Sequence, residues 1–483
     1  MSTFEGKIYW RGEYGYEEER TGAVFNARKP DRFPAAILKA AGENDVMAGV
    51  RLARERGLKV SVRSGGHSWV GWGLRDEALL IDLSQIREIS LDPDSMIVRA
   101  SPAVNGGAEL DPFLARHGLF FPGGHCPGPG LGGFLLQGGM GWNCRGWGWA
   151  CERIEAVDVV TADGEPVRAD ENQNADLLWA ARGAGPGFFG VVTRFHLRTM
   201  PRPGMIAQST YVYPLDLYEE VMHWIYEVHT DLAPSVELVV VGCRFPLPQE
   251  ARHQGDPVIV VDGVAFVDTL EEATRALSPL ETCPVVDRAL VQRSARPTTM
   301  EALRAIQRNQ NPEGHRYAAD NAWLSAGPGD AVPALRELFA TIPNEKSFVL
   351  WFSMSPLRQI PDMALSLQTD VYLAVYTIWE DEADDEACQR WLTSQMRRIE
   401  PITAGLFLAD ADLVSRPARF MAEDNWRRLQ KLRTRYDPDG LFCSYLAAED
   451  VPLNTNKWTI RSDRWSRHGS EKNEEAESAN SEI

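Results

Sequence analysis

The chain has 483 residues, 44% of them hydrophobic and 24% charged, with a formal net charge of −18. This length and composition describe a globular protein that is too long for one compact core, so we expect two domains, or three. The negative charge argues against nucleic acid or an anionic membrane surface as the main partner. No stretch of about 20 apolar residues is present to span a membrane. The N-terminus lacks a secretory h-region, and the seven cysteines lack metal-site spacing. We therefore expect a cytoplasmic protein with reduced thiols and no metal site.

The first hundred residues predict short helices and strands in alternation. Asn44 or Asp45 is placed to cap a helix that ends at Gly57. Strands are predicted at 58–63, 78–84 and 96–102, and a short helix with a glycine stop at 112–119.

A histidine follows a bare glycine turn directly after the first of these strands, in RSGGHSWVGWG (63–73). Because glycines leave the backbone free of Cβ atoms, this turn can lie against a flat or phosphorylated ligand. The alternative is an ordinary surface turn in which His67 is a solvated imidazole. The residues of the turn alone leave both interpretations open.

Residues 120–154 are the most glycine-rich part of the chain, with eleven glycines in the twenty-six positions from Gly123 to Gly148. Each interior glycine costs a regular element roughly 1 kcal/mol relative to alanine, so no helix or strand is expected. A flexible linker would carry Ser, Lys and Glu, whereas this segment carries Phe134, Leu135 and Leu136. We therefore expect a buried loop whose backbone lies close to a ligand.

A β-hairpin with Asp163 and Gly164 at its turn is predicted at 156–167, followed by a helix, a second glycine loop and a strand at 174–199. The second loop is a poor dinucleotide fingerprint, because Pro186 lies inside it and no acidic residue follows at the usual spacing. A nicotinamide Rossmann enzyme is therefore the weakest of the alternatives.

Beyond Pro201 apolar runs alternate with helix-like runs, which predicts a second domain made of a sheet with helices over one face. Strands are predicted at 236–243, 257–267, 347–355 and 371–379, and helices at 270–280, 330–342 and 424–438. Residues 462–483 are rich in charge, Ser and Asn, so we expect a disordered tail.

Several motifs in combination identify a family. They are RFPAAI (32–37), VRSGGHSWVGWG (62–73), GHCPGPGLGGFLLQGGMGW (124–142), GAGPGFFGVVTRFHLR (183–198) and NWRRLQKLRTRYDPDGLF (425–442). Together they resemble the FAD-linked oxidases of the vanillyl-alcohol-oxidase type, in the berberine-bridge-enzyme-like branch.

The resemblance implies an α+β fold. It has a two-subdomain PCMH-type FAD-binding domain and a substrate domain with an antiparallel sheet covered by helices. The implied parts are an N-terminal segment (1–30), the FAD-binding domain (31–202), the substrate domain (203–424) and a C-terminal segment returning to the FAD domain (425–450).

The resemblance also implies FAD held covalently. In the family the histidine of the RxGGH loop is joined to the flavin 8α-methyl carbon, here His67, and in bicovalent members a cysteine is joined to flavin C6, here Cys126. Imidazole nitrogen and thiolate are nucleophiles suited to the electron-poor ring. Some members keep only the histidyl link, and Cys144 and Cys151 nearby are interpreted as small buried hydrophobes. Further cofactor-binding residues implied are Arg63, Ser64, Gly65, Gly66, Ser68, His125, Gly130, Gly132, Gly133, Gly138, Gly139, Gly141, Trp142, Gly190 and Val192.

The implied reaction is transfer of a hydride from a C–H next to O or N to flavin, while a base takes a proton and O2 accepts the electrons to give H2O2. The candidate catalytic residues are Tyr445, first, then Tyr372, Tyr376 and Asp410, with His125 adjoining the linked cysteine. The family often shows Tyr-x-Asn-Tyr where this chain has GLFLADADL (405–413), which leaves open whether its base and its substrate are those of relatives.

Three points about function stay open. A flavin dehydrogenase or oxidative cyclase that does not use O2 would share every motif, and a flavin-binding protein with a decayed site is suggested by the altered 405–413 segment. The substrate is a small molecule, and the fifteen tryptophans favour an aromatic or ring-shaped one. Nothing in the sequence fixes the oligomeric state.

Overall fold

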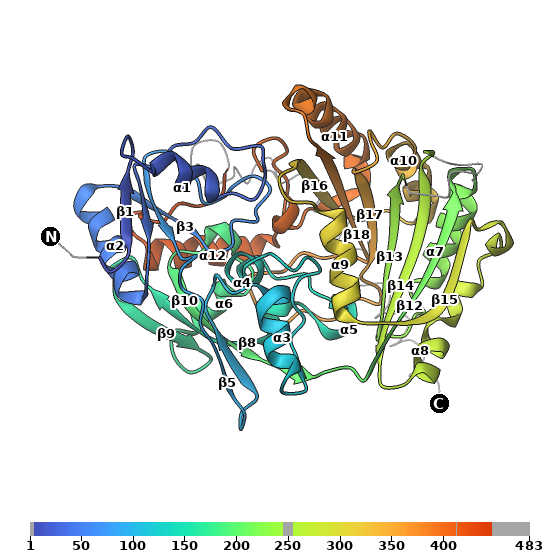
Figure 1. Ribbon diagram of the computed structural model, residues 1–483, viewed down its shortest axis with the longest axis horizontal. Coiled ribbons are helices and arrows are strands. Elements are labelled where there is room, and N and C mark those ends of the chain that lie inside the picture. The colour runs from blue at the N-terminus through green and yellow to red at the C-terminus, as the bar shows by residue number, and fades with distance from the viewer. Residues whose placement is uncertain (1–3, 245–254, 412, 447–483) are drawn as a thin grey trace, which may run out of the picture.

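The computed structural model describes residues 4–244, 255–411 and 413–446. Its two halves lie side by side, the N-terminal half with two small sheets and the other half with one large sheet (Figure 1). The tail predicted at 462–483, and residues 447–450 of the implied C-terminal segment, lie outside the described residues. Among the described residues, no helix has the length and apolar composition needed to cross a membrane.

The first small sheet has the strand order β1-β2-β4-β3, in which β2, β4 and β3 are parallel and β1 is antiparallel to β2. Its elements are β1 (Lys7–Trp10), α1 (Tyr16–Gly22), β2 (Ala36–Lys39), α2 (Glu43–Arg56), β3 (Lys59–Arg63) and β4 (Ala78–Asp82). Helix α2 packs Val46, Val50 and Ala53 into the core. It ends at Gly57, as predicted, with a φ of 66°. The predicted cap was wrong, because the helix begins after Gly42 without a side-chain cap.

The second small sheet is antiparallel, in the order β5-β6-β10-β8-β9. Its strands are β5 (Ile89–Asp92), β6 (Ile97–Ala100), β8 (Ile154–Val160), β9 (Pro166–Asp170) and β10 (Val191–Arg198). Strands β8 and β9 form the hairpin predicted at 156–167. Helix α6 (Ala175–Ala181) precedes the second glycine loop, also as predicted. Helix α3 (Asp111–Ala115) is shorter than predicted, because residues Leu119–Phe120 form β7, which pairs with β11 (Met200–Pro201).

The glycine-rich segment contains helices, contrary to the prediction of an irregular loop. They are α4 (Leu131–Leu136) and α5 (Cys144–Trp147). Glycine is required in α4 because a Cβ on Gly132 would lie 2.6 Å from Ser64 Oγ and 2.9 Å from the Cβ of Pro102. The helix therefore packs tightly against the turn that carries His67, which offsets the poor helix propensity of glycine.

The large sheet is antiparallel, in the order β15-β12-β14-β13-β17-β18-β16-β19. Its strands are β12 (Met205–Pro214), β13 (Val236–Cys243), β14 (Val258–Val267), β15 (Val291–Thr298), β16 (Arg316–Leu324), β17 (Phe348–Ser353), β18 (Val371–Trp379) and β19 (Thr403–Gly405). Strands β12, β15, β16 and β19 were not predicted.

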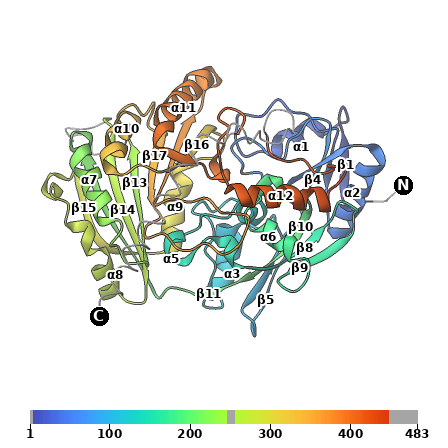
Figure 2. The ribbon, with the colours of Figure 1, turned by 180° about the vertical axis from the view of Figure 1, so that it is seen from behind.

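Helices cover one face of this sheet, as predicted: α7 (Tyr218–Val228), α8 (Leu270–Leu277), α10 (Pro328–Ala340) and α11 (Asp385–Ile399) (Figures 1 and 2). Alternate strand residues, such as Val240, Val261 and Leu373, pack under these helices. Because side chains alternate between faces, the residues between them point the other way, toward the N-terminal half. Helix α9 (Met300–Gln310) lies on that second face, where Leu303 packs near Val264.

The last helix, α12 (Glu423–Tyr436), lies across the N-terminal half beside α6 (Figure 2). The segment after it pairs with β3, where the Val60 N–H donates to Leu441 O at 2.8 Å and the Cys443 N–H donates to Val60 O at 2.8 Å. The end of the described chain is thereby joined to the strand that leads into the His67 turn.

Candidate active site

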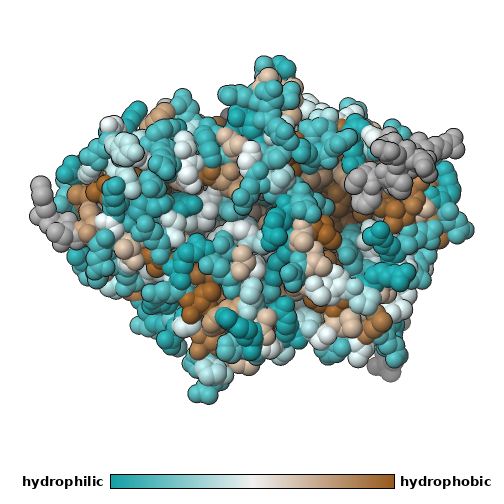
Figure 3. Space-filling view, in the orientation of Figure 1, coloured by the Kyte–Doolittle hydropathy of each residue, from teal (hydrophilic) through white to brown (hydrophobic). Residues whose placement is uncertain are grey.

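A cavity of about 850 Å³ lies between the glycine loops of the N-terminal half and the second face of the large sheet. In the space-filling view, apolar surface is visible in the recessed region between the two halves (Figure 3). All the predicted cofactor residues line this cavity except Gly138 and Gly141. Those two serve packing instead, since a Cβ on Gly138 would lie 3.2 Å from Leu365 and a Cβ on Gly141 would lie 2.1 Å from the Pro122 carbonyl.

The turn that carries His67 is anchored by a buried ion pair. Arg63, the last residue of β3, contacts Asp82 at 2.9 Å, and Lys39 contacts the same carboxylate at 2.8 Å. Asp82 is fully buried. Although burial opposes the shift, Arg63 and Lys39 lower the pKa of Asp82, so the carboxylate stays charged. The start of the turn is thereby fixed to two neighbouring strands.

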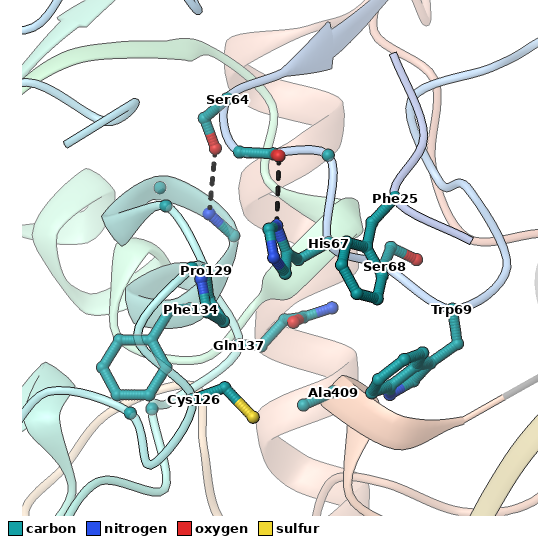
Figure 4. A pocket seen from close by; sticks show the side chains of 18 of the residues that line it. Phe25, Ser64, His67, Ser68, Trp69, Cys126, Pro129, Phe134, Gln137 and Ala409 are labelled. Carbon is teal, nitrogen blue, oxygen red and sulfur yellow. Dashed lines mark hydrogen bonds between the residues drawn. The ribbon is translucent and has the colours of Figure 1, made fainter. Parts of the chain in front are cut away.

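His67 points from this turn into the cavity (Figure 4). Its Nδ1–H donates to Gly65 O at 3.3 Å, and its ring stacks on Phe25 with centroids 4.5 Å apart. Burial lowers the pKa of His67, with the Gly65 carbonyl opposing the shift. The imidazole is therefore neutral at pH 7, the form in which a ring nitrogen is a nucleophile.

The two glycine loops lie back to back at this point. A Cβ on Gly65 would lie 2.4 Å from the Gly130 nitrogen, and a Cβ on Gly128 would lie 2.6 Å from His67 Nε2. Only glycine allows this approach, which brings the turn of His67 and the loop of Cys126 to one wall of the cavity.

Cys126 also lines the cavity, with its side chain drawn beside Ala409 in Figure 4. Burial, with a contribution from the Asp410 charge, raises the pKa of the Cys126 thiol to about 12. Cys144 and Cys151 do not line this cavity and belong to the hydrophobic core, as expected. Of the three thiols in this segment, only Cys126 faces the space that His67 faces.

These residues fit FAD. The cavity wall combines a neutral imidazole, a thiol, and glycine backbone such as that of Gly133, where a Cβ would meet nothing within 4 Å. The buried indole N–H groups of Trp72 and Trp142, which belong to the lining, have no acceptor among the described residues. An elongated, partly polar molecule that stacks on aromatic rings would satisfy both features.

A carboxylate also lines this cavity. Asp410 lies in a short helical turn, Leu408–Asp410, and accepts hydrogen bonds from Trp69 Nε1 at 2.7 Å and from the Tyr372 hydroxyl at 2.7 Å. The turn is held by Asn321, whose amide donates to Phe407 O at 2.8 Å and accepts from the Phe407 N–H at 2.7 Å. The altered 405–413 segment is thus tied to β16 and presents one carboxylate to the cavity. Residue 412 of that segment lies outside the described residues.

Tyr372 and Tyr376, both candidate catalytic residues, lie four positions apart on β18, so they share one face of the strand, and both line the cavity. Burial and the nearby Asp410 charge raise the pKa of each well above its usual value. Both hydroxyls are therefore protonated at neutral pH and can donate hydrogen bonds.

Tyr445, the first candidate for the base, does not line the cavity, so the structure does not support it in that role. Its hydroxyl donates to Ala184 O at 2.6 Å, and its ring packs against Phe420 and Trp426. Burial raises the pKa of Tyr445, and both its hydroxyl and its ring are in contact with other groups of the protein. It supports the second glycine loop, where a Cβ on Gly187 would lie 2.3 Å from its hydroxyl oxygen.

The polar residues of the sheet wall were not predicted from the sequence. Glu237 on β13 and Asp262 on β14 point into the cavity beside Gln208 on β12. Each acidic residue occupies a cavity-facing position in a strand that is otherwise apolar, in VELVVVGC and VIVVDGVAFV. That isolated acidic residue was a signal that could have located them. Trp69, directly after the predicted His67 and Ser68, was also missed as a hydrogen-bond partner of Asp410.

Of the fifteen tryptophans, Trp69, Trp72 and Trp142 line the cavity. Others, such as Trp323 and Trp351, are fully buried core residues. Tryptophan content therefore reflects the core as well as the cavity.

Comparison with known proteins gives a consistent result. The family model described as "FAD binding domain" matches residues 34–170. The FAD-linked oxidoreductase ptmO of Penicillium ochrochloron is 38% identical over 431 residues, which cover 89% of this chain and 94% of that protein.

Two solved structures share the fold. Glucooligosaccharide oxidase of Acremonium strictum, described with a 6-S-cysteinyl, 8α-N1-histidyl FAD, matches with a TM-score of 0.79 at 18% identity over 92% of this chain and 98% of that one. 6-Hydroxy-D-nicotine oxidase of Arthrobacter nicotinovorans matches with a TM-score of 0.78 at 21% identity over 91% and 97%.

Proposed function

Since the chain belongs to the FAD-linked oxidoreductases, we propose that it is an oxidase of a small organic substrate, taking a hydride from a C–H next to O or N. We propose that its FAD is covalently held through His67 and Cys126, and that O2 accepts the electrons and yields H2O2. The observation that carries this proposal is a single cavity lined by His67, Cys126 and the hydrogen-bonded carboxylate of Asp410. Support for the choice of oxidase comes from the two oxidases that share the fold.

Asp410 is the proposed base. Tyr372 and Tyr376 are protonated at neutral pH and so cannot accept a proton there, whereas a carboxylate can. Trp69 and Tyr372 donate to the carboxylate and fix its direction toward the cavity. When bound, FAD supplies the two-electron acceptor, and the protein's share is to orient the substrate and to hold its hydroxyl or amine proton on Asp410.

The sheet wall shapes the substrate side of the cavity. Val239, Leu350 and Phe352 make most of its centre apolar, while Tyr372 and Tyr376 stand near Asp410. Aromatic and aliphatic side chains of this kind exclude water and contact a ring-shaped substrate, which agrees with the preference drawn from the sequence.

The test begins with the purified protein, whose visible spectrum is recorded before and after acid precipitation. Flavin colour in the pellet of the wild type, lost when both His67 and Cys126 are replaced by alanine, is the expected result. Colour released to the supernatant would contradict covalent attachment, and a colourless protein that does not take up FAD would contradict the function itself.

The role of Asp410 is tested with Asp410→Asn and the matched variant Asp287→Asn, an exposed carboxylate outside the cavity. With a substrate found by screening alcohols and amines for anaerobic bleaching of the flavin, Asp410→Asn should lower the rate of that bleaching by roughly 10²–10⁴-fold. Asp287→Asn should leave it unchanged. Bleaching without peroxide release in air would favour a dehydrogenase, and an unchanged rate in Asp410→Asn would exclude this residue as the base.

A further inference from the structure

The two residues proposed to carry FAD are held in different ways. His67 is held within the N-terminal half, by the Gly65 carbonyl and by stacking on Phe25. Cys126 lies in the loop Gly124–Gly130, and the side chain next to it, His125, reaches across to the large sheet. This difference means that the two attachment points depend on different contacts.

His125 contacts the large sheet through a hydrogen bond that joins the two halves of the molecule. His125 Nε2–H donates to Glu237 Oε1 at 2.9 Å, and the other carboxylate oxygen, Oε2, accepts from the Asn143 N–H at 2.6 Å. One carboxylate of β13 therefore binds the glycine-rich segment at two points, one immediately before Cys126 and one after α4.

Glu237 is well fixed for this task. Its side chain is 3% exposed, and a buried carboxylate needs donors for both oxygens, since it has lost its hydration. The chain leading into β13 is held by Arg145 of the N-terminal half, which donates to the carbonyls of Leu232, Ala233 and Val236 at 2.6–3.0 Å. The position of Glu237 is thus set by the docking of the two halves.

The surroundings of His125 leave its ring little freedom. It lies against Trp142 with centroids 4.4 Å apart and meets the edge of Phe352 on β17 at 5.9 Å. Both rings line the same cavity as Cys126. A ring held on two sides and hydrogen-bonded at its end fixes the backbone from which Cys126 projects.

We propose that the His125–Glu237 hydrogen bond positions Cys126 for its attachment to FAD, so that the second covalent link forms only when the large sheet is docked. This inference rests on the covalent attachment proposed above. In the attachment a bond forms between Cys126 Sγ and flavin C6, and the S–H and C6–H bonds break. The two protons and two electrons released pass to O2 as H2O2. His125 and Glu237 are positioning residues in this step and take no part in the bond changes.

The test uses the His67→Ala protein, in which Cys126 is the remaining attachment point. His125→Leu keeps the size of the side chain and removes its donor, whereas His125→Gln keeps an N–H donor of similar reach. After expression and acid precipitation, the flavin absorbance of the pellet and the mass of the peptide that contains Cys126 are measured. In His67→Ala/His125→Leu the Cys126-linked fraction should fall roughly tenfold or more, the size of a lost hydrogen bond to a charged group. His67→Ala/His125→Gln should retain most of the linked fraction.

Matched controls separate positioning from misfolding. Asp262 of the adjacent strand lines the same cavity, but its carboxylate bonds Gln208 and Thr210 instead of the loop. Asp262→Asn in the His67→Ala protein should therefore leave the Cys126-linked fraction unchanged. In the His125→Leu protein with His67 intact, flavin should remain in the pellet through His67, which shows that the protein folds.

Two outcomes would overturn the inference. One is an undiminished Cys126-linked fraction in His67→Ala/His125→Leu. The other is the absence of any linked flavin in His67→Ala itself, which would mean that Cys126 is not an attachment point. In the second case flavin linked to His67 in the wild type, together with substrate-dependent bleaching, would leave the proposed oxidase function standing.

Discussion

Replacing Gly65 by alanine is expected to separate the two glycine loops that form one wall of the cavity. The added Cβ would lie 2.4 Å from the nitrogen and 2.9 Å from the Cα of Gly130, whereas ordinary contacts begin at 3.4 Å. The loops must therefore move apart by about 1 Å, since both atoms belong to the backbone and cannot rotate away. Overpacking of this kind costs about 1–3 kcal/mol.

The size of the effect on melting follows from the size of the domain. For a domain of 150–250 residues each kcal/mol shifts Tm by about 2–4 °C, so we expect a fall of several degrees. Because the same movement displaces the turn of His67, the fraction of flavin retained by the acid-precipitated protein should fall as well.

Gly22→Ala is the matched control, since a Cβ there meets nothing within 4 Å and the residue is the last of helix α1 and does not line the cavity. Alanine is favoured over glycine in a helix by about 1 kcal/mol, so this variant should melt at the same temperature or higher. Thermal unfolding followed by circular dichroism, with flavin content measured on the same samples, distinguishes the two. A Gly65→Ala protein with the Tm and flavin content of the wild type would refute the back-to-back packing of the loops.

Three further changes test other parts of the site. Tyr445→Phe should lower the stability by about 1 kcal/mol through loss of one buried hydrogen bond and leave kcat unchanged; a large loss of kcat would restore this tyrosine as a candidate base. Asp82→Asn takes from Arg63 its carboxylate partner, while Lys39 keeps its ion pair with Glu19 at 3.1 Å, and should cost about 3–5 kcal/mol in unfolding free energy. Arg63 and Lys39 lower the folded pKa of Asp82, although burial opposes the shift. The stabilisation by the Asp82 carboxylate is therefore complete above the ordinary carboxyl pKa of about 3.9 and is lost as the pH falls through the folded value. The Tm of Asp82→Asn should depend less on pH in acid than the Tm of the wild type. Asn321→Leu removes both hydrogen bonds that hold the turn of Asp410 and should lower kcat with about 1–3 kcal/mol of destabilisation, whereas unchanged kinetics would show that the turn is held by other contacts.

The glycine loops could be predicted from the sequence because their chemistry is local. Gly65, Gly66 and His67 are neighbours in the chain, and Cys126 lies in a motif within one loop, so the family resemblance could be recognised from short continuous segments. The fold class followed from the family resemblance, and the helix-covered sheet from the apolar runs that alternate with helix-like runs beyond Pro201.

The partners of the proposed base could not be predicted in this way. Trp69 and Asp410 are separated by 341 positions, and His125 and Glu237 by 112, so only the docking of the two halves brings them together. Tyr445 was the first candidate for the base, but the direction of its side chain depends on a contact far away in sequence, the hydrogen bond to the Ala184 carbonyl.

The missed strands have a physical explanation as well. Strand β15 is an exposed, polar edge strand, so it lacks the apolar alternation that identifies a strand. Strand β16 carries Asp320 and Asn321 in its interior, which reads as a loop in sequence. In the fold Asp320 pairs with Arg416 at 2.6 Å, and Asn321 bonds the backbone at Phe407.

Because side chains alternate between the two faces of the large sheet, substitutions on one face affect folding and substitutions on the other face affect the cavity. Residues such as Val240, Val261 and Leu373 hold the covering helices, and changes there cost folding free energy. Neighbours on the same strands, such as Val239 and Leu350, line the cavity instead. Substrate preference can therefore change by single substitutions at such positions, while the helix-covered core and the cofactor loops keep their sequences. One scaffold can in this way acquire new substrates in evolution without first losing its stability.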